Sequence, residues 1–160
     1  MPEPDPDSGP DSGPASDPDS GLARFRAAQD RIWPAPLEEL RAGRKTSHWM
    51  WFVLPQLRGL GRSPAAVFYG IGDAAEARAY LADPVLRRRL LDCAAALLGH
   101  RNRAAADILG PVDALKLRSS ATLFARAAGG TDPAAAAAMR AILDAFFDGR
   151  PCPETLARLG

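Results

Sequence analysis

The chain has 160 residues and a mass of 17.0 kDa, with 47% hydrophobic and 24% charged residues, as is usual for one soluble globular domain. These values exclude a collagen, a disulfide scaffold and a fully disordered chain. The formal net charge of +1 is unevenly distributed. Residues 1–21 contain five Asp and one Glu but no Lys or Arg, so the rest of the chain carries +7.

Residues 1–21 are expected to form a disordered acidic tail of Pro, Asp, Ser and Gly. They hold six of the fifteen prolines and no aromatic residue. Such a segment buries too little apolar area to offset an ordering entropy of roughly 1–2 kcal/mol per residue. We expect the tail either to solubilise the protein or to fold back over a basic surface. Residues 22–160 are predicted to form a single domain.

No segment has the features of a targeting sequence or a membrane anchor. The longest apolar runs have six residues, whereas a membrane span needs roughly 20. The acidic N-terminus resembles neither a secretory signal nor a mitochondrial presequence. Cys93 and Cys152 lack CxxC or metal-ligand spacing, so both are expected to be reduced thiols. The predicted location is cytoplasmic, with no membrane partner.

The sequence predicts an all-α, compact multihelical domain of six to eight short helices. Apolar spacing and capping residues predict helices from Leu22 to before Pro34, around Leu37 up to Gly43, after Asp73, from Asp83–Pro84 to Gly99, from Asp113, and from Asp132–Pro133 to Gly149, with a last turn around Leu156 and Leu159. Val67–Ile71 is the one strand candidate.

The segment from Arg44 to Ser63 differs in composition from the rest of the chain, because it holds two of the three tryptophans and one of the two histidines. A helix from Ser47, with Ser47 as its cap, would place His48, Trp51, Phe52 and Pro55 on one face. Trp49 and Trp51 would then point about 200° apart. We therefore expect one tryptophan in the core and the other at a pocket, where an indole can stack on a ring.

The same segment carries a resemblance to a known family. The phrase from Lys45 to Leu57, with Gly59–Ser63, resembles the signature of the bacterial family known as domain of unknown function 1810. Further matching phrases are Ala77 to Leu86, Leu115 to Phe124, and Phe147 to Leu156. The resemblance covers roughly Leu22 to Leu159 and implies a small, cytoplasmic, mainly helical domain. It implies no activity.

Ser47 and His48 do not form a nucleophile and base pair, because adjacent helical residues point about 100° apart. No G-x-S-x-G elbow is present. His48 remains a candidate general acid/base or ligand donor, with a buried, backbone-bonded histidine as the alternative. Lys116 is the second catalytic candidate.

The two lysines of the chain, Lys45 and Lys116, both fall inside family phrases. This coincidence suggests that an amine is needed there, for a phosphate or a carbonyl. Lys116 shares a helical face with Ser119 and Ser120, and Arg118 is adjacent. The alternative is a solvated helix face with capping hydroxyls.

The sequence contains no motif for specific nucleic-acid binding, metal binding or nucleotide-cofactor binding. Arg87–Arg89 give a basic surface, but no nucleic-acid-binding motif supports a specific nucleic-acid partner. Two separated histidines and two separated cysteines predict no metal site. No nucleotide-binding motif is present, and no cofactor is predicted.

These observations leave two hypotheses of function. The first is a pocket for a small anionic ligand that bears a phosphate, such as a nucleotide or an ADP-ribose derivative, lined by the candidates Lys45, Ser47, His48, Trp51, Gln56, Tyr69, Lys116, Arg118, Ser119 and Ser120. A fainter similarity to helical N-glycosidases of the NADAR type extends this hypothesis to cleavage of an N-glycosidic bond. The acidic residue that those enzymes carry beside the histidine is absent, because Ser47 is followed directly by His48. The second hypothesis is a non-catalytic interaction module whose basic surface meets an acidic protein.

Overall fold

The computed structural model describes residues 21–160. The predicted acidic tail therefore lies outside the described residues, apart from Gly21. Ten helices occur in the described range: α1 (Ala23–Asp30), α2 (Ala35–Ala42), α3 (Met50–Val53), α4 (Pro64–Tyr69), α5 (Ala74–Ala82), α6 (Pro84–Leu98), α7 (Ala105–Leu109), α8 (Pro111–Ala128), α9 (Pro133–Phe147) and α10 (Pro153–Leu159). The all-α prediction is confirmed, but the helices outnumber the six to eight predicted because α4 and α7 were not expected.

The strand prediction for Val67–Ile71 is wrong. Most of this segment belongs to α4, which Pro64 begins and Ser63 caps by accepting a 3.1 Å hydrogen bond from a first-turn amide. Only Ile71 forms a β-type contact, a single parallel bridge to Leu57. Apart from this single bridge, residues 21–160 contain no β-structure.

The predicted helix boundaries at aspartates and glycines are largely confirmed. The side chains of Asp73, Asp83 and Asp132 accept hydrogen bonds from first-turn amides of α5, α6 and α9. Gly43 ends α2 at φ 79°, in the left-handed region that glycine adopts readily. These residues therefore stop and start the helices as their chemistry predicts.

The predicted start of α8 at Asp113 is wrong by two residues. Gly110, at φ 88°, ends α7, and Pro111 occupies the first position of α8. Asp113 consequently lies inside the first turn, and its carboxylate is available for side chains from elsewhere.

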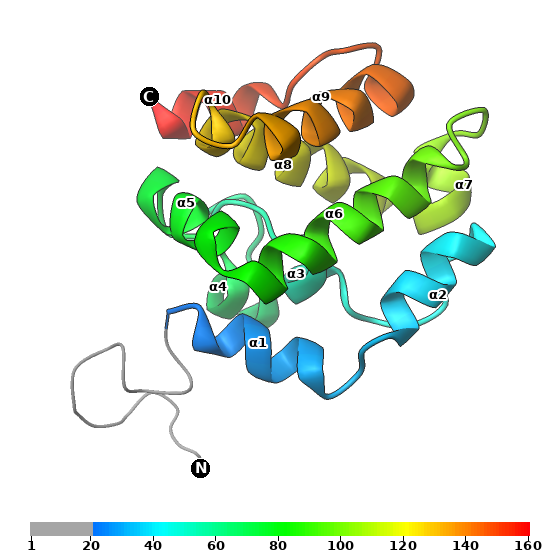
Figure 1. Ribbon diagram of the computed structural model, residues 1–160, viewed down its shortest axis with the longest axis horizontal. Coiled ribbons are helices and arrows are strands. Elements are labelled where there is room, and N and C mark those ends of the chain that lie inside the picture. Colours follow the sequence, from blue (N-terminus) through cyan, green and yellow to red (C-terminus); the bar gives the residue numbers. More distant parts are fainter. Residues whose placement is uncertain (1–20) are drawn as a thin grey trace.

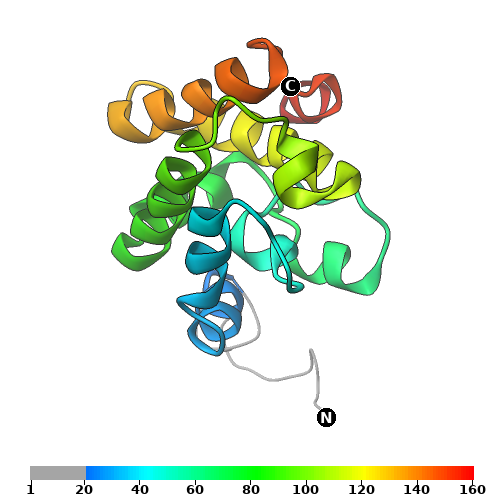
Figure 2. The ribbon, with the colours of Figure 1, turned by 90° about the vertical axis from the view of Figure 1, so that its right-hand side faces the viewer.

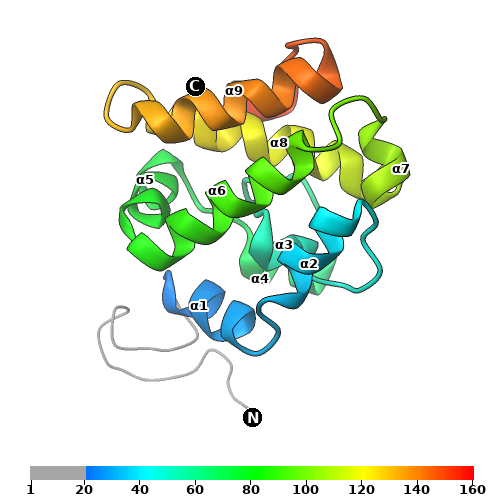
Figure 3. The ribbon, with the colours of Figure 1, turned by 45° about the vertical axis from the view of Figure 1, so that its right-hand side comes forward.

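Helix α8 lies beside α9 (Figure 1) and packs against α9, α5, α7 and α10. Helices α9 and α10 lie at one end and α1 at the other (Figures 1 and 3). Figure 2 shows α9 and α10 on one side of α8, with the segment of α3 and α4 on its opposite side. The largest fully buried side chains include Trp49, Tyr80, Phe25 and Phe124. Within residues 21–160, none of the helices is both long and apolar enough to cross a bilayer.

Candidate functional site

The two lysines of the chain meet at one carboxylate. The ammonium of Lys45 lies 2.9 Å from Oδ2 of Asp113, and that of Lys116 lies 3.6 Å from Oδ1. The Lys45 side chain is 9% exposed and the Lys116 side chain 23%. Because one carboxylate neutralises only one of two ammonium groups, the cluster keeps an excess positive charge. Its more exposed member is Lys116.

Each lysine of this cluster also lies over a tryptophan. The Lys45 ammonium is 5.1 Å from the ring centroid of Trp49, and the Lys116 ammonium is 5.3 Å from that of Trp51. Trp49 is 1% exposed and belongs to the core, whereas Trp51 is half-buried. The two tryptophans therefore face different surroundings, as the sequence predicts.

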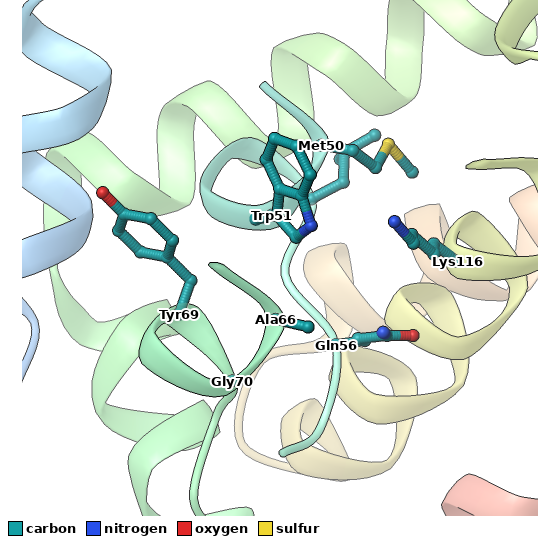
Figure 4. Close-up of a pocket in the computed structure, with 8 residues that line it drawn as sticks. Met50, Trp51, Gln56, Ala66, Tyr69, Gly70 and Lys116 are labelled. Atoms are coloured by element: carbon teal, nitrogen blue, oxygen red, sulfur yellow. The ribbon is translucent and has the colours of Figure 1, made fainter. Parts of the chain in front are cut away.

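A narrow recess lies between the segment of α3 and α4 and helix α8. Figure 4 shows the ammonium of Lys116 directed toward the indole of Trp51, with Gln56 on the same side. The ring of Tyr69 lies on the other side of Trp51, and its hydroxyl points away from Lys116. The recess has a volume of about 10 Å³ and is lined by Met50, Trp51, Leu54, Gln56, Ala66, Tyr69, Gly70 and Lys116. It has room for about one water molecule.

A wider cavity, here called the outer groove, adjoins the recess. Its volume is about 410 Å³, which is within the range of small-molecule sites. Gln56, Ala66 and Lys116 line both spaces, so Lys116 lies at their junction. The other residues of the outer groove are Leu60, Gly61, Arg62, Ser63, Val112, Leu115, Ser119 and Glu154. A ligand larger than water therefore has room beside Lys116 in the outer groove, and the recess behind is closed to it.

The charged side chains of the outer groove are two cations and one carboxylate. Lys116 and Arg62 supply the positive charges, and Glu154 is the one acidic residue among the described residues that line the groove. Neither Arg62 nor Glu154 forms an ion pair within residues 21–160. The groove is therefore suited to an anionic group, with one additional hydrogen-bond acceptor in its wall.

The predicted helix from Ser47 is wrong, because the segment before α3 is a loop held by Glu39 of α2. One carboxylate oxygen of Glu39 accepts hydrogen bonds from the amides of Thr46 and Ser47 and from the indole of Trp49, at 2.8, 3.1 and 2.9 Å. The other accepts a 2.5 Å hydrogen bond from the Ser47 hydroxyl. Burial raises the pKa of Glu39, but these hydrogen bonds lower it by more, to about 2. His48 lies exposed on this loop, so its interpretation as a buried histidine is also wrong.

The predicted site residues thus fall into separate groups. Gln56, Lys116 and Ser119 line the outer groove, while Trp51 and Tyr69 line the recess alone. Lys45 lies behind Asp113, and neither cavity includes Ser47 or His48. The structure therefore does not bring all ten candidates into one pocket.

Arg118 and Ser119, which follow Lys116 on α8, contact the chain between α9 and α10. Arg118 donates hydrogen bonds of 2.9 and 3.0 Å to the carbonyls of Arg150 and Pro151. Ser119 and Ser120 are buried, and the Ser120 hydroxyl has no hydrogen-bond partner among the described residues. The alternative of a solvated face is therefore wrong for both serines.

The basic surface predicted at Arg87–Arg89 is partly neutralised. Arg87 pairs with Asp132 and Arg89 with Asp30, each at 2.8 Å. Arg88 is the exposed member, with only a 3.9 Å contact to Asp92. Two of the three arginines therefore serve contacts inside the protein.

Sequence reasoning missed several residues that shape the site. Asp113 was expected only as a helix cap, and Glu39, Arg62, Val112, Leu115 and Glu154 were not candidates. Arg62 lies inside a family phrase, which is a signal that could have found it. Glu39 lies in no family phrase and carries no local signal, because its role depends on how distant segments pack. No cluster of His, Cys, Asp or Glu side chains suited to a metal ion occurs in residues 21–160.

Comparisons with known proteins place the chain in a family. The family model described as "Protein of unknown function (DUF1810)" matches residues 19–159. The crystal structure of the conserved hypothetical protein Rv1873 from Mycobacterium tuberculosis is similar, with 46% sequence identity and a TM-score of 0.82. The match covers 89% of this chain and 98% of the mycobacterial chain. No curated protein matches. The chain therefore belongs to the DUF1810 family, as its sequence motifs suggested.

Proposed function

We propose that this protein binds a small phosphate-bearing anion, of the nucleotide or ADP-ribose class, in the outer groove. The observation that carries the proposal is the excess positive charge of the Lys45–Asp113–Lys116 cluster at the junction of the two cavities. Arg62 adds a second cation to the same groove. Two cations in one cavity are a common arrangement for phosphate recognition.

The role of Lys116 is that of a cation and not of a nucleophilic amine. Its ammonium lies 3.6 Å from Oδ1 of Asp113 and 5.3 Å from the ring centroid of Trp51, and both are contacts that a cation makes. An amine that attacks a carbonyl must lose its proton. The geometry therefore supports phosphate binding over reaction with a carbonyl.

The site supports binding better than hydrolysis. Enzymes that cleave glycosidic bonds usually need two carboxylates, or one carboxylate and a second acid/base group, that face the ligand. His48 lines neither cavity, and Glu154 is the one carboxylate among the described groove residues. The interaction module that uses Arg87–Arg89 has less support, because two of these arginines already pair within the protein.

Calorimetric titration of the full chain with AMP and with ADP-ribose tests the proposal. We expect binding of at least one of them, and a loss of about tenfold or more in affinity in Lys116→Ala, with partial recovery in Lys116→Arg. Arg126→Ala is the matched control, because Arg126 is an exposed cation of the same helix that does not line the groove. The proposal would be contradicted if neither AMP nor ADP-ribose binds. It would also be contradicted if Lys116→Ala and Arg126→Ala bind the ligand with equal affinity.

A further inference from the structure

The outer groove is larger and more varied than a phosphate alone requires. Beyond Lys116 and Arg62, its wall contains one carboxylate, Glu154, and two exposed apolar side chains, Val112 and Leu115. A phosphate would contact the cations and leave these three residues in water. The groove therefore has a second part that fits the organic body of a ligand.

The carboxylate of Glu154 is a hydrogen-bond acceptor that a ligand could use. It lies in the first turn of α10, is exposed, and forms no hydrogen bond or ion pair through its side chain within the described part of the chain. An ionised carboxylate only accepts hydrogen bonds, so a ligand group beside it must donate. A hydroxyl fits better than an ammonium, because an ammonium would also meet Lys116 and Arg62 in the same groove.

The apolar wall is a stripe along α8. Val112 and Leu115 are each 65% exposed and are spaced three residues apart, so they lie on the same helix face. They are two of only four large hydrophobic residues exposed in residues 21–160. A flat apolar group that covered them would be held by removal of this surface from water.

We propose that Glu154 determines specificity by accepting hydrogen bonds from sugar hydroxyls of the bound phosphate compound, while Val112 and Leu115 cover the face of its base. This inference rests on the proposed function, since it places the phosphate at Lys116 and Arg62. It narrows the ligand class to nucleotides with a free ribose diol. Carboxylates that hydrogen-bond ribose hydroxyls serve this purpose in other nucleotide sites.

The test compares two probes that differ only in the sugar hydroxyls, AMP and 2′,3′-dideoxyadenosine monophosphate. We expect the full-length protein to bind AMP about tenfold more tightly than the dideoxy compound, because a hydrogen bond to a charged group contributes an affinity difference of about this size. Glu154→Gln should reduce this preference to about twofold or less, because its amide is uncharged, and should not weaken binding of the dideoxy compound. Glu38→Gln is the matched control, since Glu38 is an exposed glutamate that lines neither cavity.

The apolar stripe is tested with ribose 5-phosphate, which lacks the base. AMP should bind more tightly than ribose 5-phosphate, and Leu115→Ser should remove most of that difference. Equal affinities for AMP and its dideoxy analogue would overturn the role of Glu154 while the phosphate site stands. Equal affinities for AMP and ribose 5-phosphate would overturn the role of the stripe. Failure of all three probes to bind to the wild type would overturn this inference and the nucleotide assignment together. If the probes bind to the wild type but not to Lys116→Ala, that result supports the phosphate site and not the roles of Glu154 and the stripe.

Discussion

The ammonium of Lys45 lies 2.9 Å from a carboxylate oxygen of Asp113, and this contact joins the loop before α3 to the first turn of α8. The loop is also anchored by its backbone, because the amide of Lys45 donates a 2.8 Å hydrogen bond to the carbonyl of Ile108. The same carboxylate faces Lys116 at the groove. A largely buried ion pair thus connects two segments far apart in the sequence and lies directly behind the candidate site.

Removal of either partner of this ion pair should destabilise the protein. Lys45→Ala and Asp113→Ala should each lower the free energy of unfolding by about 1–2 kcal/mol, because the first leaves Asp113 with only its 3.6 Å contact to Lys116 and the second leaves two ammonium groups without this carboxylate. The double variant should lose less than the sum of the single variants, with a coupling of at least about 0.5 kcal/mol. Urea unfolding of the wild type, the two single variants and the double variant measures these free energies of unfolding. Strict additivity would show that the contact contributes nothing.

The loop before α3 should lose its anchorage at low pH. The pKa of Glu39 is about 2 in the folded protein against an ordinary value of 4.5, so its ionisation stabilises the fold. This contribution is fully present above about pH 4.5 and is lost as the pH falls towards about 2. Glu39→Gln should therefore cost about 1–2 kcal/mol at pH 7 and progressively less in acid.

Denaturant unfolding at pH 7, 5 and 3 provides the measurement for Glu39. Glu38→Gln is the matched control, because Glu38 is the exposed neighbour on the same helix. A stability difference between wild type and Glu39→Gln that stays constant from pH 7 to pH 3 would contradict the assignment of the low pKa.

The helices that the sequence predicts best are those whose ends carry a chemical signal. Asp73, Asp83 and Asp132 are followed by apolar helical patterns, and each caps a helix in the structure. Helix α7 has five residues and no side-chain cap, so local sequence gives little indication of it. Short helices of this kind depend on packing, in this case against α8.

The site was predictable only where its residues lie within one segment. Trp51, Gln56 and Lys116, which line one recess in the structure, stand out in the sequence because unusual residue types gather in two phrases. The sequence predicts Ser47 as a helix cap, but the carboxylate of Glu39 binds its amide and that of Thr46 and fixes a loop instead. Which distant carboxylate reaches a segment is set by tertiary packing, and local spacing does not encode it.

The two neighbouring tryptophans should differ in their effect on stability. Trp49 is 1% exposed and donates an indole hydrogen bond to Glu39, so Trp49→Ala should cost about 3–5 kcal/mol. Trp51 is half-buried and contacts Lys116, so Trp51→Ala should cost less than about 2 kcal/mol. Urea unfolding distinguishes the two variants. Similar losses for both would show that the recess is part of the core.

The two cysteines should differ in their reaction with iodoacetamide. Burial, together with the charge of Asp92, raises the pKa of Cys93 to about 12. Burial also raises the pKa of Cys152, but the hydroxyl of Ser119, which donates a hydrogen bond to the sulfur, and the nearby amides of Thr155 and Glu154 lower it by more. Because the thiolate is the reactive form, the native protein should be labelled at Cys152 first, and at Cys93 only after unfolding.

Peptide mass spectrometry after timed labelling at pH 7.5 identifies the modified cysteine. Ser119→Ala should slow labelling of Cys152, because it removes a hydroxyl that lies 3.5 Å from the sulfur. Ser120→Ala is the matched control on the same helix, since its hydroxyl bonds to no described residue. Equal labelling rates at Cys93 and Cys152 in the native protein would contradict the prediction, because the lowered pKa of Cys152, a residue that is 7% exposed, would then have no effect on its reaction.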